Sequence, residues 1–133
     1  METEITIQVS WANSQKTIIL SVFGEDWTLE EYHNMIDEMY KMTTSVEHTV
    51  HTINDFSNNH TSPTKLLSTG RHVENRKVPN SGMGIIVNAN PFLKAMGQVS
   101  MRLFLKDLNI HFVKSIEEAY QTIAKYEQAS SKS

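Results

Sequence analysis

The order of hydrophobic periodicities along the chain constrains the fold more than any other sequence feature. Apolar and polar residues alternate over residues 5–11, and a polar turn cluster at 12–16 separates this run from a second β-type run at 17–23. After that point, helical periodicity alternates with short β-type runs. A short link between strands predicts an antiparallel hairpin, whereas strands separated by helices predict parallel pairing through right-handed crossovers.

The first predicted helix begins at residue 28. Thr28 and Glu31 match a capping box, in which each side chain accepts a hydrogen bond from an otherwise unpaired backbone N–H group. Apolar residues then recur at three- and four-residue intervals, which is typical of an amphipathic helix reaching to about Thr44. The residues expected to face the core are Leu29, Tyr32, Met35, Ile36, Met39 and Met42.

The remaining elements follow from the same signals. Strands are expected at 48–56, 83–89 and 110–113, and helices at 63–77, from 92 and from 116. Ser115 and Glu118 match a second capping box. The residues of the last helix that are expected to point inward are Ile116, Ala119, Tyr120 and Ile123.

These elements predict a single α/β domain over residues 1–127, followed by a flexible C-terminal tail at 128–133. The expected order is β-β-α-β-α-β-α-β-α. We expect a mixed, mainly parallel sheet with an antiparallel N-terminal hairpin strand and helices packed on it.

Composition excludes several classes of protein. The 133 residues fit one domain of common size, and no apolar run approaches the roughly 20 residues of a membrane helix. The chain has no cysteine, which excludes disulfides, thiolate zinc sites and cysteine nucleophiles. The acidic start, Met1 to Glu4, lacks the basic character of a signal peptide, so we expect a cytoplasmic protein.

The net charge of −3 hides an uneven distribution. Residues 1–60 contain ten acidic and two basic side chains, and residues 61–114 contain two acidic and eight basic side chains. The net charges of these segments are −8 and +6, and residues 115–133 contribute −1. If these segments occupy different faces, the domain carries a dipole that could orient a partner. The alternative is that solvated helix faces happen to differ in the sign of their charge. We expect no binding to nucleic acid.

Residue types that support catalysis or metal binding do not form recognisable motifs. The six histidines lack metal-ligand spacing, and His48 and His51 lie three residues apart on a predicted strand, where they point to opposite faces. No G-x-S-x-G nucleophile elbow is present. Gly82 and Gly84 precede a strand, whereas phosphate-binding loops open a helix. We therefore expect no metal, no cofactor and no enzymatic activity.

The segment from Asp55 to Thr64 is the candidate site. It joins the carboxyl end of a predicted central strand to a helix N-terminus, where open α/β sheets bind ligands and where free N–H groups favour a phosphate. Its candidate ligand-binding or phospho-acceptor residues are Asp55, Ser57, Ser62 and Thr64. The alternative is a solvated loop in which Ser62 only caps the helix.

The order of elements and the triplet Asp55-Phe56-Ser57 at the end of the third strand resemble the STAS domain of anti-sigma-factor antagonists, the SpoIIAA-like family. In that family, a serine at the start of the next helix is phosphorylated by the cognate kinase, and Thr64 occupies the matching register. The resemblance implies a SpoIIAA-like fold and a non-enzymatic module that binds a protein or a small ligand.

The chain departs from the family pattern near that position. Pro63 replaces the family's aspartate, and Lys65 or Leu66 replaces its glycine. The segments 27–32 and 90–92 look closer to a divergent branch of unassigned function. The fold of that branch is also compared with lipid-binding Sec14-like domains.

Two functions follow as hypotheses. The first is a STAS-like regulatory module that docks a protein partner through residues 55–64 and the helix after them, tuned by phosphorylation at Thr64, Ser62 or Ser57. The basic residues expected to face an acidic partner are Lys65, Arg71, Arg76 and Lys77.

The second hypothesis is a carrier of a small apolar molecule or lipid, with a cavity between sheet and helices. The residues expected to line that cavity are Met35, Met39, Phe92 and Met96. A homodimer also stays open, because a hairpin leaves an edge strand that must be covered or paired.

Overall fold

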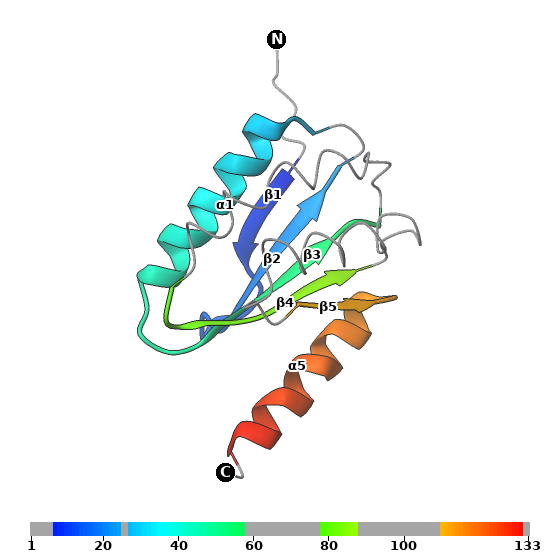
Figure 1. The fold of residues 1–133 in the computed structure, drawn as a ribbon. Helices are drawn as coiled ribbons and strands as arrows, with labels where there is room; N and C mark the ends of the chain where they lie inside the picture. Colours follow the sequence, from blue (N-terminus) through cyan, green and yellow to red (C-terminus); the bar gives the residue numbers. More distant parts are fainter. Residues whose placement is uncertain (1–6, 25–26, 58–77, 88–109, 132–133) are drawn as a thin grey trace.

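The structure is a computed structural model that describes residues 7–24, 27–57, 78–87 and 110–131 (Figure 1). Its strands are β1 (Ile7–Trp11), β2 (Ile18–Phe23), β3 (Val50–Asp55), β4 (Ser81–Val87) and β5 (Ile110–Val113). The helices within these residues are α1 (Leu29–Thr44) and α5 (Ile116–Ser131). The helices expected at 63–77 and from 92 lie outside the described residues.

The described strands form one sheet in the order β1-β2-β3-β4-β5. β1 pairs with β2 in antiparallel orientation, whereas β2 to β5 are parallel to one another. This topology confirms the α/β class and the mixed, mainly parallel sheet with an antiparallel hairpin strand. Because β2 to β5 point the same way, their C-terminal ends share one end of the sheet, which we call the carboxyl end, and their starts share the amino end (Figure 1).

α1 packs against one face of the sheet, and its expected capping box is present. Thr28 Oγ1 accepts a hydrogen bond from the Glu31 N–H at 3.1 Å, and Glu31 Oε1 accepts one from the Thr28 N–H at 3.2 Å. The buried cluster beneath the helix comprises Ile7, Ile19, Phe23, Trp27, Met35, Met39, Val50 and Phe56. The expectation that Leu29 faces this core is wrong. Its side chain is 37% exposed, whereas Trp27, two residues earlier, is buried in the cluster.

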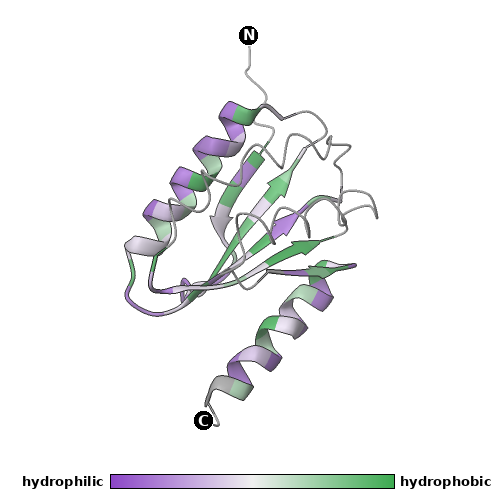
Figure 2. Ribbon diagram, in the orientation of Figure 1, coloured by the Kyte–Doolittle hydropathy of each residue, from purple (hydrophilic) through white to green (hydrophobic). Residues whose placement is uncertain are grey.

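α5 packs against the opposite face of the sheet, onto the strand side chains that alternate with those beneath α1. The cluster beneath it comprises Ile18, Ile53, Met83, Ile85, Val87, Ala119 and Ile123. In Figure 2 the apolar residues concentrate in the strands, whereas both helices carry a mixture. Tyr120 was expected to point inward but is 39% exposed, because it lies about 100° round the helix from the buried Ala119.

Both ends of α5 differ in detail from the sequence-based expectation. Ser115 Oγ accepts from the Glu118 N–H at 3.1 Å, as the capping box requires, but Glu118 Oε2 accepts from the Lys114 N–H at 3.1 Å, one residue earlier than expected. Residues 128–131, expected in the tail, continue the helix to Ser131, since no glycine or proline interrupts it. Neither described helix is long and apolar enough to cross a membrane.

Candidate functional site

The candidate site begins where β3, the central strand, ends. Asp55 pairs in register with Val22 of β2 and Val87 of β4, so it lies at the carboxyl end of the sheet between two neighbouring strands. The Phe56 N–H donates to the Val87 carbonyl at 3.1 Å and extends the pairing by one residue. The carboxyl end of parallel strands is where open α/β sheets bind their ligands.

A tight turn fixes the direction in which the chain leaves β3. Asp55 Oδ1 accepts hydrogen bonds from the Ser57 N–H at 2.9 Å and from the Ser57 hydroxyl. Between them, Phe56 is buried and stacks on Phe23 with ring centroids 4.1 Å apart. The buried ring anchors the turn from below, while the Ser57 side chain is exposed at its top. We call residues 55–57 the Asp55–Ser57 turn.

A polar pair supports the same end of the sheet on the α1 face. Ser21 is fully buried and donates its hydroxyl proton to Asn54 Oδ1 at 2.8 Å. The Asn54 side-chain amide in turn donates to the Ile85 carbonyl at 3.3 Å. These bonds join β2, β3 and β4 one residue before the Asp55–Ser57 turn. This pair was not predicted from the sequence. The signal that could have indicated it is a polar residue, serine or asparagine, within each of two β-type runs.

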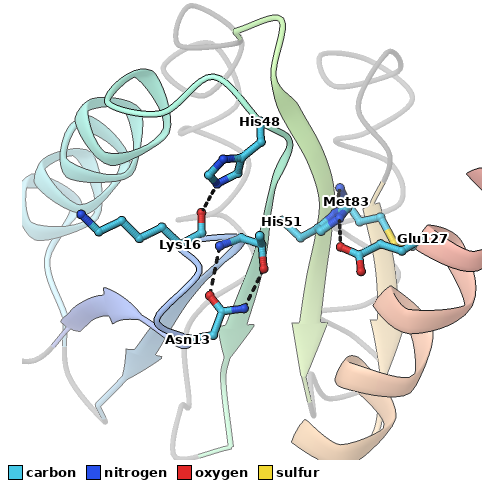
Figure 3. A network of polar contacts seen from close by, with 7 residues as sticks. Asn13, Lys16, His48, His51, Met83 and Glu127 are labelled. Atoms are coloured by element: carbon cyan, nitrogen blue, oxygen red, sulfur yellow. Dashed lines mark hydrogen bonds and ion pairs between the residues drawn. The ribbon is translucent and has the colours of Figure 1, made fainter. Parts of the chain in front are cut away.

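A second polar cluster lies at the amino end of the sheet, around His51 (Figure 3). His51 is 1% exposed and sits where the register between β3 and β4 shifts, between Val50 and Thr52. At this bulge the Met83 N–H donates to His51 Nδ1 at 2.9 Å instead of to a backbone carbonyl. Gly82 is required beside it, because an added Cβ would lie 2.7 Å from His51 Cε1.

The opposite nitrogen of the same ring contacts α5. His51 Nε2 lies 3.3 Å from Glu127 Oε1, and the Tyr126 ring meets the imidazole edge-on with centroids 5.6 Å apart. Because Nδ1 accepts from a backbone N–H, the neutral ring carries its proton on Nε2 and donates it to the carboxylate. Burial lowers the pKa of His51 from its ordinary value of 6.5, and the charge and hydrogen bond of Glu127 offset part of that shift.

The loops at the amino end are joined by side-chain bonds to backbone (Figure 3). Asn13 closes the β1–β2 turn, since its Oδ1 accepts from the Thr17 N–H at 3.0 Å. Lys16 adopts a positive φ of 57° in this turn, and its carbonyl accepts from His48 Nε2 at 2.8 Å. His48 was expected within the third strand, but it is exposed and precedes β3, which begins at Val50.

The sequence-predicted site residues fall into three groups. Asp55 and Ser57 are brought together in the turn described above. Met35 and Met39, expected to line a cavity, lie buried in the cluster between α1 and the sheet. The remaining candidates lie outside the described residues, namely Ser62, Thr64, Lys65, Arg71, Arg76, Lys77, Phe92 and Met96.

The arrangement at the carboxyl end is suited to binding. Within residues 7–24, 27–57, 78–87 and 110–131, no three His, Asp or Glu side chains are grouped so that they could hold a metal ion. The Asp55–Ser57 turn instead offers an exposed hydroxyl beside a carboxylate, above the buried stack of Phe56 on Phe23. No protein-family model, curated protein or solved structure matches the chain.

Proposed function

We propose that this chain is a non-enzymatic, STAS-like regulatory module that docks a protein partner at the carboxyl end of its sheet. The observation that carries the proposal is the Asp55–Ser57 turn, which presents a hydroxyl and a carboxylate directly after the central strand. The triplet that forms this turn is also the one on which the STAS resemblance rests.

The base of the turn favours docking because buried contacts within the chain already hold it in place. Phe56 is buried against Phe23, and the Asn54 side chain bridges to Ser21 and to β4. A surface that is already ordered loses little conformational entropy on binding, so more of the contact energy appears as affinity.

Phosphorylation of Ser57 would act directly on this geometry. The hydroxyl that now donates to Asp55 would become a phosphate with a charge of about −1.5 to −2 at neutral pH. Repulsion between the phosphate and the carboxylate would open the turn and change the docking surface. Ser62 and Thr64 remain further candidate phospho-acceptors in the segment that follows, together with the basic residues proposed to face an acidic partner: Lys65, Arg71, Arg76 and Lys77.

Affinity purification from the native host, followed by binding measurements with the purified partner, tests the proposal. Ser57→Asp places a negative charge beside Asp55 and should weaken binding by about tenfold or more, which corresponds to about 1.4 kcal/mol. Ser14→Asp is the matched control, because Ser14 is exposed in the β1–β2 turn at the amino end of the sheet. It should leave the affinity unchanged within about twofold.

Two results would count against the proposal. One is that no protein is recovered reproducibly with the wild-type chain. The other is that Ser57→Asp and Ser14→Asp bind a recovered partner with the same affinity, since docking would then not involve the carboxyl end of the sheet.

A further inference from the structure

Among the described residues, His51 is a buried titratable group that the proposed docking function does not use. It lies at the amino end of the sheet, beneath the C-terminal half of α5. Its Nδ1 accepts a hydrogen bond from the Met83 N–H, and its Nε2 faces the Glu127 carboxylate. Both ring nitrogens are therefore engaged, one with the sheet and one with the helix.

The position of His51 along α5 matters as much as its burial. The apolar stripe that holds the helix on the sheet, Ile116, Ala119 and Ile123, ends at Ile123. One helical turn further on, the same side of the helix carries Glu127, which is 54% exposed and contacts His51. Residues 124–129 are exposed, and α5 extends past the sheet toward the C-terminus (Figure 1).

We propose that His51 is a pH-sensitive latch for the C-terminal half of α5, closed when the imidazole is neutral and released when Nδ1 is protonated. Protonation turns Nδ1 from an acceptor into a donor, so two N–H groups would face each other at the 2.9 Å that now separates Nδ1 from the Met83 nitrogen. That hydrogen bond cannot survive, and both donors would be left unpaired in a buried site. Because Tyr126 and Glu127 of α5 contact the ring, movement of this helix away from the sheet would let water reach it.

Within the part of the chain that the structure describes, the other groups around the imidazole do not remove this conflict. From α5 the titratable neighbours are the Glu127 carboxylate and the Tyr126 phenol. From β4 the neighbours are Gly82 and Met83, and from β2 the register partner is Ile18, none of which titrates. The Glu127 carboxylate beside Nε2 attracts the positively charged ring, but burial has the larger effect. The pKa of His51 is therefore lowered while α5 is packed on the sheet, which we call the docked state of the helix.

The direction in which pH shifts the release of α5 follows from the difference in the pKa of His51 between the docked and released states of the helix. The released ring titrates near the ordinary pKa of 6.5, while the docked ring has a lower pKa. As pH falls below 6.5, the released state takes up protons first and becomes favoured. The opening equilibrium should rise by at most about tenfold per pH unit between the two pKa values, because one proton is involved.

NMR on the full chain tests the latch directly. The ring ¹⁵N shifts at pH 7.5 should show the proton of His51 on Nε2. Hydrogen exchange of amides 126–131, corrected for the intrinsic pH dependence, should accelerate between pH 7.5 and pH 5. Amides 119–123 on the same helix serve as an internal control and should keep their protection, since their residues pack on the apolar cluster.

Three variants separate the latch from general fraying of the helix. His51→Asn keeps an acceptor near the Nδ1 position but does not titrate, so exchange at 126–131 should no longer change between the two pH values. Glu127→Gln keeps an oxygen that accepts from Nε2 and removes the attraction to the protonated ring, so its loss of protection at pH 5 should equal or exceed that of the wild type. Glu117→Gln, an exposed substitution at the start of the same helix, should behave as the wild type.

The proposal is overturned if the proton of His51 resides on Nδ1 at pH 7.5, if the His51 pKa lies above 6.5, or if exchange at 126–131 is equally slow at both pH values. If His51→Asn does not fold, the pH titration of the wild type and the exchange measured for Glu127→Gln still test the latch. These outcomes do not depend on whether a partner binds at the carboxyl end of the sheet.

Discussion

The rings of Phe23 and Phe56 stack with their centroids 4.1 Å apart and their planes inclined by 15°. Phe23 is the last residue of β2, and Phe56 directly follows β3, so this stack joins two neighbouring parallel strands beneath the Asp55–Ser57 turn. Trp27 meets Phe23 edge-on at 5.4 Å and extends the cluster toward α1. The Asp55–Ser57 turn therefore lies directly above the part of the core that these aromatic rings form.

Replacement of Phe56 by alanine should lower the free energy of unfolding by about 3–5 kcal/mol, because it removes a buried ring and leaves a cavity against Phe23. Phe56→Leu keeps most of the volume and should cost on the order of 1 kcal/mol. Urea denaturation followed by tryptophan fluorescence measures both values. Tyr40→Ala, at a position 41% exposed on α1, should change stability by no more than about 0.5 kcal/mol. Equal losses for Phe56→Ala and Tyr40→Ala would show that the stack does not anchor this end of the core.

The sheet could be predicted largely from the sequence because its signals are local. The short turn after Trp11 predicts a hairpin, and the strand expected at 110–113 begins and ends where predicted. The Thr28–Glu31 capping box gives the start of α1 for the same reason. Leu29 and Tyr120 were placed wrongly, because spacing identifies an apolar stripe but not which of its members lie at its edge and stay exposed.

The His51 cluster could not be predicted from the sequence, because it depends on contacts between residues distant along the chain. Met83 and Glu127 lie far from His51 in sequence, and the bulge that turns the Met83 N–H toward the ring is a property of strand pairing. The glycine at position 82 was a visible signal, since glycine within a strand often marks a bulge or a close approach. Sequence patterns likewise locate Asp55 at the end of a strand, but they cannot show that its carboxylate binds Ser57.

Asn80 should be sensitive to substitution, because it joins several backbone segments at the amino end of the sheet. Its side-chain amide donates to the carbonyls of Thr43, Val46 and His48 at 2.8, 3.0 and 3.0 Å, and so holds the connection between α1 and β3. Asn80→Ala leaves these carbonyls without their donor and should cost about 1–3 kcal/mol.

Asn80→Asp is the sharper test, because it keeps the shape, removes the donors and places a negative charge against the carbonyl oxygens. Thermal unfolding should show a loss at least as large as that of Asn80→Ala. Asn34→Ala is the control, since Asn34 is exposed on α1 and alanine favours a helix. If Asn80→Asp is as stable as the wild type, the side-chain amide does not hold this loop.

Lys16 offers a stabilising substitution. Its φ of 57° lies in the left-handed region, which costs residues with a Cβ about 1–2 kcal/mol relative to glycine. Lys16→Gly should therefore raise the free energy of unfolding by up to about 1 kcal/mol, since the greater freedom of glycine in the unfolded chain offsets part of the gain. Gln15→Gly in the same turn is the matched control and should lower stability. Chemical denaturation at pH 7.5 compares the two, and a loss for Lys16→Gly as large as that for Gln15→Gly would contradict the left-handed backbone at position 16.

His51 should also make global stability depend on pH, with a sign set by its lowered pKa in the folded chain. Above the ordinary value of 6.5 the ring is neutral in both states, and the contribution of its hydrogen bonds is fully present. As pH falls below 6.5 toward the folded-state pKa, the unfolded chain binds the proton more readily, so this contribution is lost with a slope of at most about 1.4 kcal/mol per pH unit.

The quantity to compare is the difference in unfolding free energy between the wild type and His51→Asn, measured by urea denaturation from pH 8 to pH 5. Contributions from the other histidines and from the carboxylates that do not contact His51 cancel in that difference, because both chains contain them, whereas the Glu127 contact is part of what the difference measures. The difference should be constant above pH 7 and shift against the wild type at lower pH. A shift in favour of the wild type would mean that Glu127 stabilises the protonated ring more than burial and the Met83 N–H disfavour it, and that the pKa of His51 is raised on folding.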